Sequence, residues 1–318
     1  MLKKEIFSVV IVLIAIGFIS SLSVHAQENL VPSWIKDTAD FWANGHISDM
    51  EFINSMKFLV ENEIVEFSTK KPIDDKGNFH ITYEENPSTM FDYSTKDWLM
   101  DNEYLESQAD FLNEVFRLPH DVEILATECK EANMFYDWES KQVILCYEFV
   151  DQVYVDFVTY YESNPEVHVT EDEIDIMTYD VMDFVFYHEV GHALVDVYDL
   201  PITGLEENAV DQFAAMSMFF YEDDPDSEVI IGQDILYNVG TWFLIQTQND
   251  AEHVYWDTHN LDIQRFYNIS CYSFGQNPEY NQDLIYEGWL PEERAVNCEH
   301  EYYLLFKSWN TLLEPYYQ

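Results

Sequence analysis

The sequence predicts an α+β protein in which a few short strands precede a mostly helical half. Runs with the alternation typical of β-strands lie between residues 79 and 150. A longer apolar run, Val181 to Tyr198, contains no proline and is typical of a buried helix. From Gly232 onward the pattern is mostly helical, and no internal repeat is evident. A sheet ahead of the long helix is therefore expected.

The elements ahead of that helix follow from local patterns. Strands are expected over Phe79–Tyr83, Val122–Thr127, Met134–Tyr136 and Val143–Val150, with a helix over Trp98–Phe116 and a turn over Asp137–Ser140. Residues 162–175 are acidic and are expected to form a surface connection. An edge strand can bind an extended peptide by backbone pairing, and Asn133–Tyr136 is the candidate edge. An ordinary hairpin held by a disulfide is the alternative.

The most informative motif is His188-Glu189-Val190-Gly191-His192, inside the predicted long helix. Helix positions i and i+4 lie on one face, so His188 and His192 point the same way. This is the spacing with which two imidazoles hold one zinc ion. Glu189 can face the same ion and act as the general base that takes a proton from zinc-bound water. A core helix that happens to carry two histidines is the alternative.

A catalytic zinc ion needs a third protein ligand and one open position. Asp196 continues the helical spacing, but on one helix it lies about 12 Å from His188, which is too far for a shared ion. The third ligand must therefore come from another element. Pro201 ends the first helix, and Thr203-Gly204-Leu205-Glu206 has the pattern of a capping box that opens a second one.

The second helix offers the acidic ligand. If Glu206 bonds the Thr203 backbone in the capping box, Glu207 is left to bind zinc. Asp211 shares the face of Glu207 and is expected to accept the other ring N–H of a zinc-binding histidine. Two alternatives are open: Glu206 is the ligand, or Glu207 is only a solvated residue of the first helical turn.

Three segments, His188–Leu194, Leu200–Glu207 and Ala209–Ala214, resemble a family of zinc metallopeptidases known as a domain of unknown function. The resemblance extends over residues 77 to 318. It looks like the gluzincin arrangement, in which a glutamate from a following helix completes a two-histidine site. It implies a zincin-like domain, Zn2+ as the cofactor and a peptide or protein as the substrate. The gap between the second histidine and the glutamate is shorter than in thermolysin-like gluzincins, so a tight connection between the helices is expected.

The resemblance also implies a hydrogen-bond donor for the negative charge that develops on the substrate's carbonyl oxygen. Gluzincins generally take this donor, a His or Tyr, from a C-terminal helical segment. Asp257-Thr258-His259 offers a histidine with a carboxylate nearby, so His259 is the candidate. His253 and Tyr267 are the next choices, and a purely structural histidine is the alternative.

The amino-acid composition limits the kinds of molecule that the protein is expected to bind. The formal net charge is −47, and such a field repels phosphate backbones and anionic lipid surfaces, which argues against nucleic-acid binding. It is compatible with cationic substrates or with adaptation to salt. The chain has three arginines, Arg117, Arg265 and Arg294, and these are expected to pair with carboxylates. Substrate binding is the alternative.

The N-terminus predicts export. Lys3-Lys4, an apolar run from Ile6 to Leu22 and then Val24-His25-Ala26 form the pattern of a secretory signal cleaved after Ala26. An uncleaved membrane anchor is the alternative. In either case the protein is expected to be secreted or otherwise extracytoplasmic.

Four cysteines in an exported chain suggest two disulfides. Cys129–Cys146 and Cys271–Cys298 are the preferred pairs among the three possible connectivities, because each is local. No C-x-x-C spacing occurs, which argues against zinc binding by these thiols.

The predicted organisation has four parts: a signal peptide (1–26), a helical module (27–67), a polar linker (68–77) and the zincin-like domain (78–318). The module resembles a short helical unit of exported archaeal proteins, which suggests cell-envelope association; a packing extension of the catalytic domain is equally open. The sequence thus predicts an exported zinc metallopeptidase. The alternatives are a noncatalytic zinc-containing envelope or binding protein and a zinc hydrolase of non-peptide amides.

Overall fold

The computed structural model describes residues 42, 46–48, 52, 75–220, 230–249 and 258–318. The chain divides into two units, Met1–Pro72 and Ile73–Gln318. The signal peptide and most of the helical module and linker lie outside the described residues, so their predictions stay predictions. Within the first unit, the helical residues Trp42 and Phe52 stack their rings with centroids 4.5 Å apart. Among the described residues, none of the helices has the length and apolarity needed to cross a membrane.

The second unit contains a four-stranded mixed sheet. Its strands are β1 (Phe79–Tyr83), β2 (Val122–Thr127), β3 (Met134–Asp137) and β4 (Gln142–Cys146), in the order β1-β2-β4-β3. The pairs β1–β2 and β2–β4 are parallel, and β3–β4 is an antiparallel hairpin. The predicted strands are confirmed here except for the last one, and β3 is an edge strand, as predicted.

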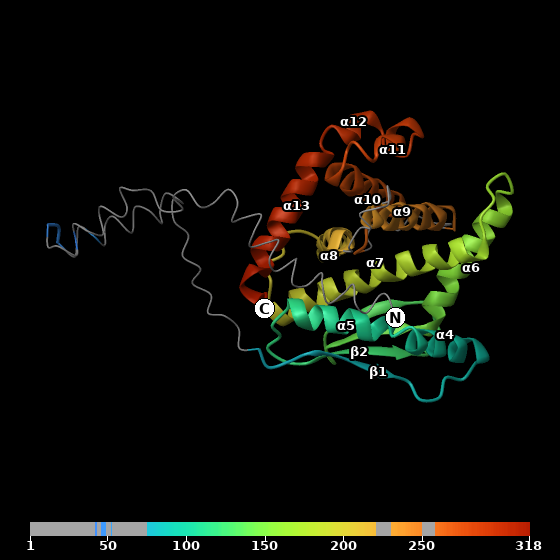
Figure 1. Ribbon diagram of the computed structural model, residues 1–318, viewed down its shortest axis with the longest axis horizontal. Coiled ribbons are helices and arrows are strands. Elements are labelled where there is room, and N and C mark those ends of the chain that lie inside the picture. Colours follow the sequence, from blue (N-terminus) through green and yellow to red (C-terminus); the bar gives the residue numbers. More distant parts are fainter. Residues whose placement is uncertain (1–41, 43–45, 49–51, 53–74, 221–229, 250–257) are drawn as a thin grey trace. The chain divides into compact units, whose positions relative to one another are not determined.

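Helices make up the rest of the unit, so the α+β class is confirmed. They are α4 (Met90–Asp101), α5 (Tyr104–Val115), α6 (Tyr147–Ser163), α7 (Glu171–Tyr198), α8 (Glu206–Ser217), α9 (Ile231–Asn249), α10 (Asp262–Gln276), α11 (Gln282–Tyr286), α12 (Glu292–Ala295) and α13 (Cys298–Leu313). Short 3₁₀ turns follow α8 and α13. Figure 1 shows α7 crossing the unit between the layer of the sheet with α4 and α5 and the layer of α8 to α13.

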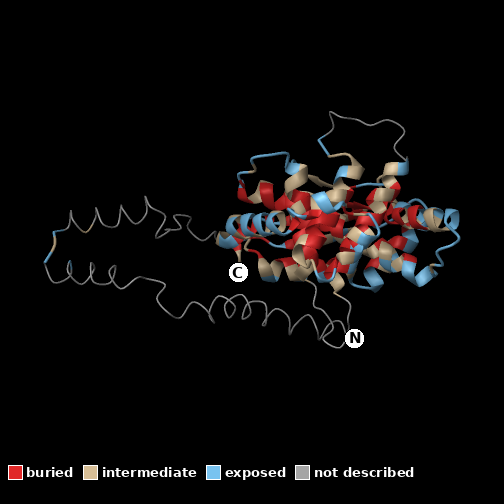
Figure 2. Cartoon of the chain, turned by 90° about the horizontal axis from the view of Figure 1, so that it is seen from above, coloured by how far each residue is buried: buried red, intermediate tan, exposed pale blue. Residues whose placement is uncertain are grey.

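Helix α7 lies in the core of this unit, because it packs against other helices and against strands β3 and β4. Its buried residues extend from Ile174 to Tyr198, and Figure 2 shows buried residues gathered through the middle of the unit. A helix covered on all sides has no polar face, which agrees with the nearly continuous apolar run of its C-terminal half.

The start of α7 corrects one sequence prediction. Residues 162–175 were expected to be a connection, but α7 begins at Glu171, where Thr170 and Glu173 form a capping box. Acidic residues in a first turn are favoured by the helix dipole. Here they were interpreted as a surface loop, although they form the first turn of the helix. The helix ends at Tyr198, with Asp199 in the left-handed region at φ 50°, just before Leu200 and the predicted stop at Pro201.

Two other predictions were wrong at element boundaries. The helix expected over Trp98–Phe116 is two helices, since the chain turns at Glu103, which has φ 50°. The strand expected over Val143–Val150 ends at Cys146, and α6 begins at Tyr147. A short apolar run does not distinguish strand from helix; here the helical spacing of Val150, Val153 and Phe157 prevails.

Both predicted disulfides are present. Cys129–Cys146 joins the end of β4 to the segment after β2, and Cys271–Cys298 joins α10 to the start of α13. Two disulfides fit a location outside the cytoplasm.

Candidate metal centre

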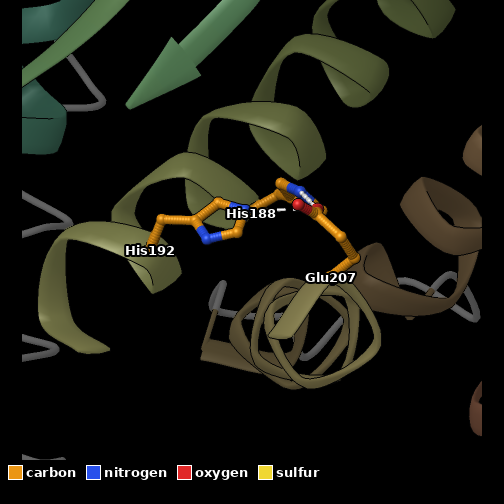
Figure 3. Close-up of side chains that lie close together, drawn as sticks. All are labelled: His188, His192 and Glu207. Carbon is orange, nitrogen blue, oxygen red and sulfur yellow. Dashed lines mark hydrogen bonds and ion pairs between the residues drawn. The ribbon is translucent and has the colours of Figure 1, made fainter. Parts of the chain in front are cut away.

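Three side chains from α7 and α8 meet at one point. His188 and His192 lie one turn apart on α7, and Glu207 lies in the first turn of α8. The Oε2 atom of Glu207 is 3.1 Å from Nε2 of His188 and 3.3 Å from Nε2 of His192 (Figure 3). One ligand atom from each residue lies within 4.8 Å of the other two. The group could therefore hold a metal ion.

A glycine allows the two helices to approach each other this closely. Gly191 lies between the histidines, and a Cβ atom at this position would be 3.0 Å from the Val210 side chain and 3.2 Å from Phe213. A side chain at this position would require Val210 and Phe213 to give way by a few tenths of an ångström. The tight passage from α7 to α8 expected from the sequence is thus accompanied by direct packing of α8 on Gly191.

The other ring nitrogen of His188 is held by a buried carboxylate. Its Nδ1 is 2.8 Å from Oδ1 of Asp211. Asp211 also accepts two hydrogen bonds from the Arg265 guanidinium, at 2.9 Å from Nε and 2.6 Å from Nη2. The guanidinium lies 4.2 Å from the centre of the Phe243 ring. The expected contact between Asp211 and a histidine is present, and Arg265 pairs with a carboxylate as expected.

The partner of His192 corrects the predicted capping box. Helix α8 begins at Glu206 itself, with Leu205 as its N-cap and no side-chain cap. The Glu206 carboxylate, expected to bond the Thr203 backbone, instead lies 2.7 Å from Nδ1 of His192. The sequence pattern of a capping box was present, but the nearby imidazole offers a stronger, charge-assisted partner.

Each histidine therefore has a carboxylate at both ring nitrogens. The Nδ1 atoms face Asp211 and Glu206, and both Nε2 atoms face Glu207. This separation of contacts favours Glu207 over Glu206 as the shared ligand. It also leaves both Nε2 atoms directed at one position, while the carboxylates at the Nδ1 atoms orient the two rings.

The pKa shifts follow from these contacts. Burial alone would raise the pKa of Glu207, but hydrogen bonds from His188, His192 and His259 hold it well below its usual range. Burial likewise opposes ionisation of Asp211, whose pKa is lowered to about 2, chiefly by the charge of Arg265 and the bond from His188. For His188 burial lowers the pKa, yet Asp211 and Glu207 raise it to about 9. The site thus stabilises positive charge on its imidazoles.

Glu189 lies beside this group with its two oxygens in different surroundings. Oε2 accepts a hydrogen bond of 2.8 Å from the backbone N–H of Tyr136 in β3. Oε1 is 4.0 Å from Nε2 of His188. Burial raises the pKa of Glu189, against the opposing effect of the two histidines. A buried carboxyl with a raised pKa suits proton transfer near neutral pH.

His259 also reaches the site, from the segment before α10. Its Nε2 lies 2.9 Å from Oε2 of Glu207, and its ring is nearly parallel to that of His188 at 6.1 Å between centroids. The side chain is half-exposed. Of the next choices, Tyr267 packs in α10 against Phe266, and His253 lies outside the described residues.

Asp196 has a role that the sequence did not indicate. The spacing argument excluded it from the metal group, and its carboxylate instead accepts a 2.6 Å bond from the Tyr136 phenol and pairs with Lys141 at 2.5 Å. These contacts fasten the β3–β4 hairpin to α7. They join segments more than fifty residues apart, which no local pattern can reveal.

Comparison with known proteins identifies the family. A family model described as "Putative metallopeptidase" (DUF4344) matches residues 83–313. The chain belongs to this family. Its resemblance to metallopeptidases is thereby confirmed for the second unit, and the family description supports a hydrolase in general. No curated protein and no solved structure matches the chain. The resemblance of the N-terminal module to exported archaeal proteins stays a prediction.

Proposed function

We propose that the chain is an exported zinc-dependent metallopeptidase that hydrolyses peptide bonds. The observation that carries the proposal is the convergence of His188, His192 and Glu207 on one position with Glu189 beside them. A noncatalytic zinc site is normally closed by a fourth protein ligand and needs no carboxylate beside its ligands. A buried carboxylate next to them, free at one oxygen, is what hydrolysis requires in addition.

The donor set fits zinc. Two imidazole nitrogens and one carboxylate oxygen are the protein ligands of a catalytic zinc site with an open fourth position. The carboxylates behind His188 and His192 fix the ring orientations, as they commonly do in zinc sites. Zinc bound there would lower the pKa of a water molecule and polarise the scissile carbonyl.

Glu189 is proposed to move the proton. Its Oε1 atom faces the metal position, so it can accept a proton from the attacking water and pass it to the leaving amine. Burial raises its pKa and so brings the two protonation states closer in free energy than they are for an exposed glutamate.

His259 is proposed to donate a hydrogen bond to the substrate's carbonyl oxygen as negative charge develops there. Its Nε2 already lies 2.9 Å from Oε2 of Glu207, beside the metal position. Its half-exposed ring can reach a substrate that enters from solvent. The β3 edge beside Glu189 is the proposed place for the substrate backbone.

The substitution E189Q tests the proposed function. It keeps the size of the side chain but removes the base, so casein hydrolysis should fall by about 10²–10⁴-fold while zinc remains bound. Metal analysis and a proteolysis assay on the same preparations would measure both. E123Q is the matched control, because Glu123 lies in β2 and contacts Gln142.

Two results would contradict the proposal. A wild type that binds zinc and cleaves no peptide in broad libraries would be a noncatalytic zinc protein. Cleavage of non-peptide amides alone would identify the other type of zinc hydrolase. Export is tested separately, by fractionating cells and sequencing the N-terminus of the mature chain to see whether residues 1–26 are removed.

A further inference from the structure

We propose that Tyr136 is a positioning residue for the base, held in place by Asp196 and Lys141. Its backbone N–H fixes one oxygen of Glu189, and its phenol anchors the strand that carries this N–H. The inference rests on the proposed function, since it concerns how Glu189 is held during hydrolysis.

The pairing of β3 leaves the Tyr136 N–H available. In the antiparallel pair β3–β4, the Cys146 N–H bonds the Asn133 carbonyl. Hydrogen-bonded positions alternate along such a pair, so the backbone of residue 136 points away from β4. At an edge strand this donor would face solvent or a substrate. Here it bonds Oε2 of Glu189 on α7 at 2.8 Å.

The same residue makes a second contact with α7 through its side chain. The Tyr136 phenol donates to Oδ2 of Asp196 at 2.6 Å. Glu189 and Asp196 are seven residues apart, which places them on one face about 10 Å apart along the helix. Tyr136 therefore touches α7 at two points, one by backbone and one by side chain. This fixes the position of β3 along the helix.

Lys141, at the other end of the hairpin turn, makes a further contact with Asp196. Its Nζ pairs with the same Oδ2 atom of Asp196 at 2.5 Å. Burial opposes ionisation of Asp196, but the bonds from Lys141 and Tyr136 lower its pKa. Asp196 is thus held as an anion that accepts from Tyr136 in β3 and from Lys141 in the hairpin turn, and β3 cannot shift without losing charged contacts.

The two carboxylate oxygens of Glu189 therefore have different roles. Because Oε2 is engaged by the Tyr136 N–H, Oε1 is the atom free to receive the proton, and it is the one near His188. The bound oxygen also prevents the carboxylate from rotating away from the metal position. A reacting group displaced by a fraction of an ångström loses rate steeply.

The first test compares Y136F and D196N with the control Y147F. Y136F removes the phenol that donates to Asp196, and D196N removes the negative charge that accepts from Tyr136 and Lys141. Y147F removes a phenol that donates to the Ala126 carbonyl in the same sheet. We expect kcat to fall about 10-fold in Y136F and D196N, with KM and zinc affinity unchanged. Y147F should keep wild-type kcat. The loss in the double variant should be smaller than the product of the two single losses, because both substitutions act on the contact between residues 136 and 196.

The second test needs no substrate. Hydrogen exchange at the amide of residue 136 should be slow in the wild type and faster in E189A, Y136F and D196N. The amide is observed by NMR after selective 15N-tyrosine labelling, or 15N-phenylalanine labelling in Y136F. Exchange should be unchanged in Y147F. This readout reports the contact between β3 and Glu189 whatever the enzyme cleaves.

The outcomes separate the two proposals. An active wild type in which Y136F and D196N keep full kcat, or show unchanged exchange at the amide of residue 136, overturns the positioning role alone. A zinc-loaded wild type that cleaves no peptide overturns the proposed function and the positioning role together. Equal loss of thermal stability in Y136F and Y147F with no change in kcat would mean that the phenol only stabilises the fold.

Discussion

At the residue scale, the donors nearest the metal position were readable from the sequence, and the groups behind them only partly so. His188 and His192 follow from helical spacing, and Glu207 from the need for a ligand on another element. Glu206 was misassigned because a capping-box pattern takes no account of an imidazole brought in by tertiary contact. The bond from Tyr136 to Glu189 joins residues 53 positions apart and leaves no local signal.

Arg265 offers a test of the groups behind His188. R265K keeps the positive charge but loses the planar guanidinium, whose Nε and Nη2 atoms donate to the two oxygens of Asp211. Asp211 can then turn away from His188, so we expect zinc affinity to fall about 10-fold or more. Competition with a chelator of known affinity would measure the change.

R294K is the matched control. Arg294 also holds a carboxylate with two bonds of 2.6 Å, but its partner is Glu301 on α13, outside the metal centre. R294K should bind zinc like the wild type. Equal affinities for R265K and the wild type would mean that the buried ion pair serves folding only.

At the element scale, the contact between α7 and α8 depends on Gly191. In G191A the new methyl group would meet Val210 and Phe213 at 3.0 to 3.2 Å, so these residues of α8 must move by a few tenths of an ångström. Glu207 lies on the same helix. We expect a loss of about 1–3 kcal/mol in the free energy of unfolding, together with weaker zinc binding. Thermal denaturation with and without zinc would show both effects.

Gly240 supplies the control for this substitution. It lies inside α9, where an added Cβ would meet the Phe266 ring at an ordinary 3.7 Å. G240A should therefore stabilise the helix by about 1 kcal/mol and leave zinc affinity unchanged. If G191A behaves in the same way, the close approach of α7 and α8 does not depend on the glycine.

The element boundaries show where sequence patterns lose their meaning. The run from Val143 onward is apolar enough for a buried strand, yet the chain turns into α6 at Tyr147, whose phenol bonds β2. The first turn of α7 was predicted to be a loop because its residues are acidic rather than apolar. Periodicity identified the elements that are long or half-exposed, and tertiary packing decided the short ones.

At the scale of the whole molecule, the α+β class and both disulfides were predictable, whereas the sheet order β1-β2-β4-β3 was not. Two parallel pairs require crossover connections, and which strands they place side by side depends on how helices cover the sheet. Charge is also a property of the whole chain. With a net charge of −47, the metal centre lies in a field that favours cations, and the absence of nucleic-acid partners stays a prediction.

The imidazoles link the metal centre to the stability of the whole molecule. In the metal-free protein the pKa of His188 is raised from 6.5 to about 9 by Asp211 and Glu207, against the effect of burial. A group whose pKa is raised by folding stabilises the fold fully below its unfolded pKa and loses this effect as pH rises through the folded one. Metal-free protein should therefore lose stability between about pH 6.5 and 9.

Zinc affinity should change in the opposite direction over the same range. The Nε2 proton of His188 must leave before the nitrogen can bind a cation, so affinity should rise with pH until His188 is neutral. Calorimetric titration in buffers of different ionisation enthalpy would count the protons released. Denaturation of the zinc-loaded protein is the control, and it should lack the loss of stability seen in the metal-free form. Zinc affinity that is constant from pH 6.5 to 9 would contradict the strong coupling of His188 to its two carboxylates.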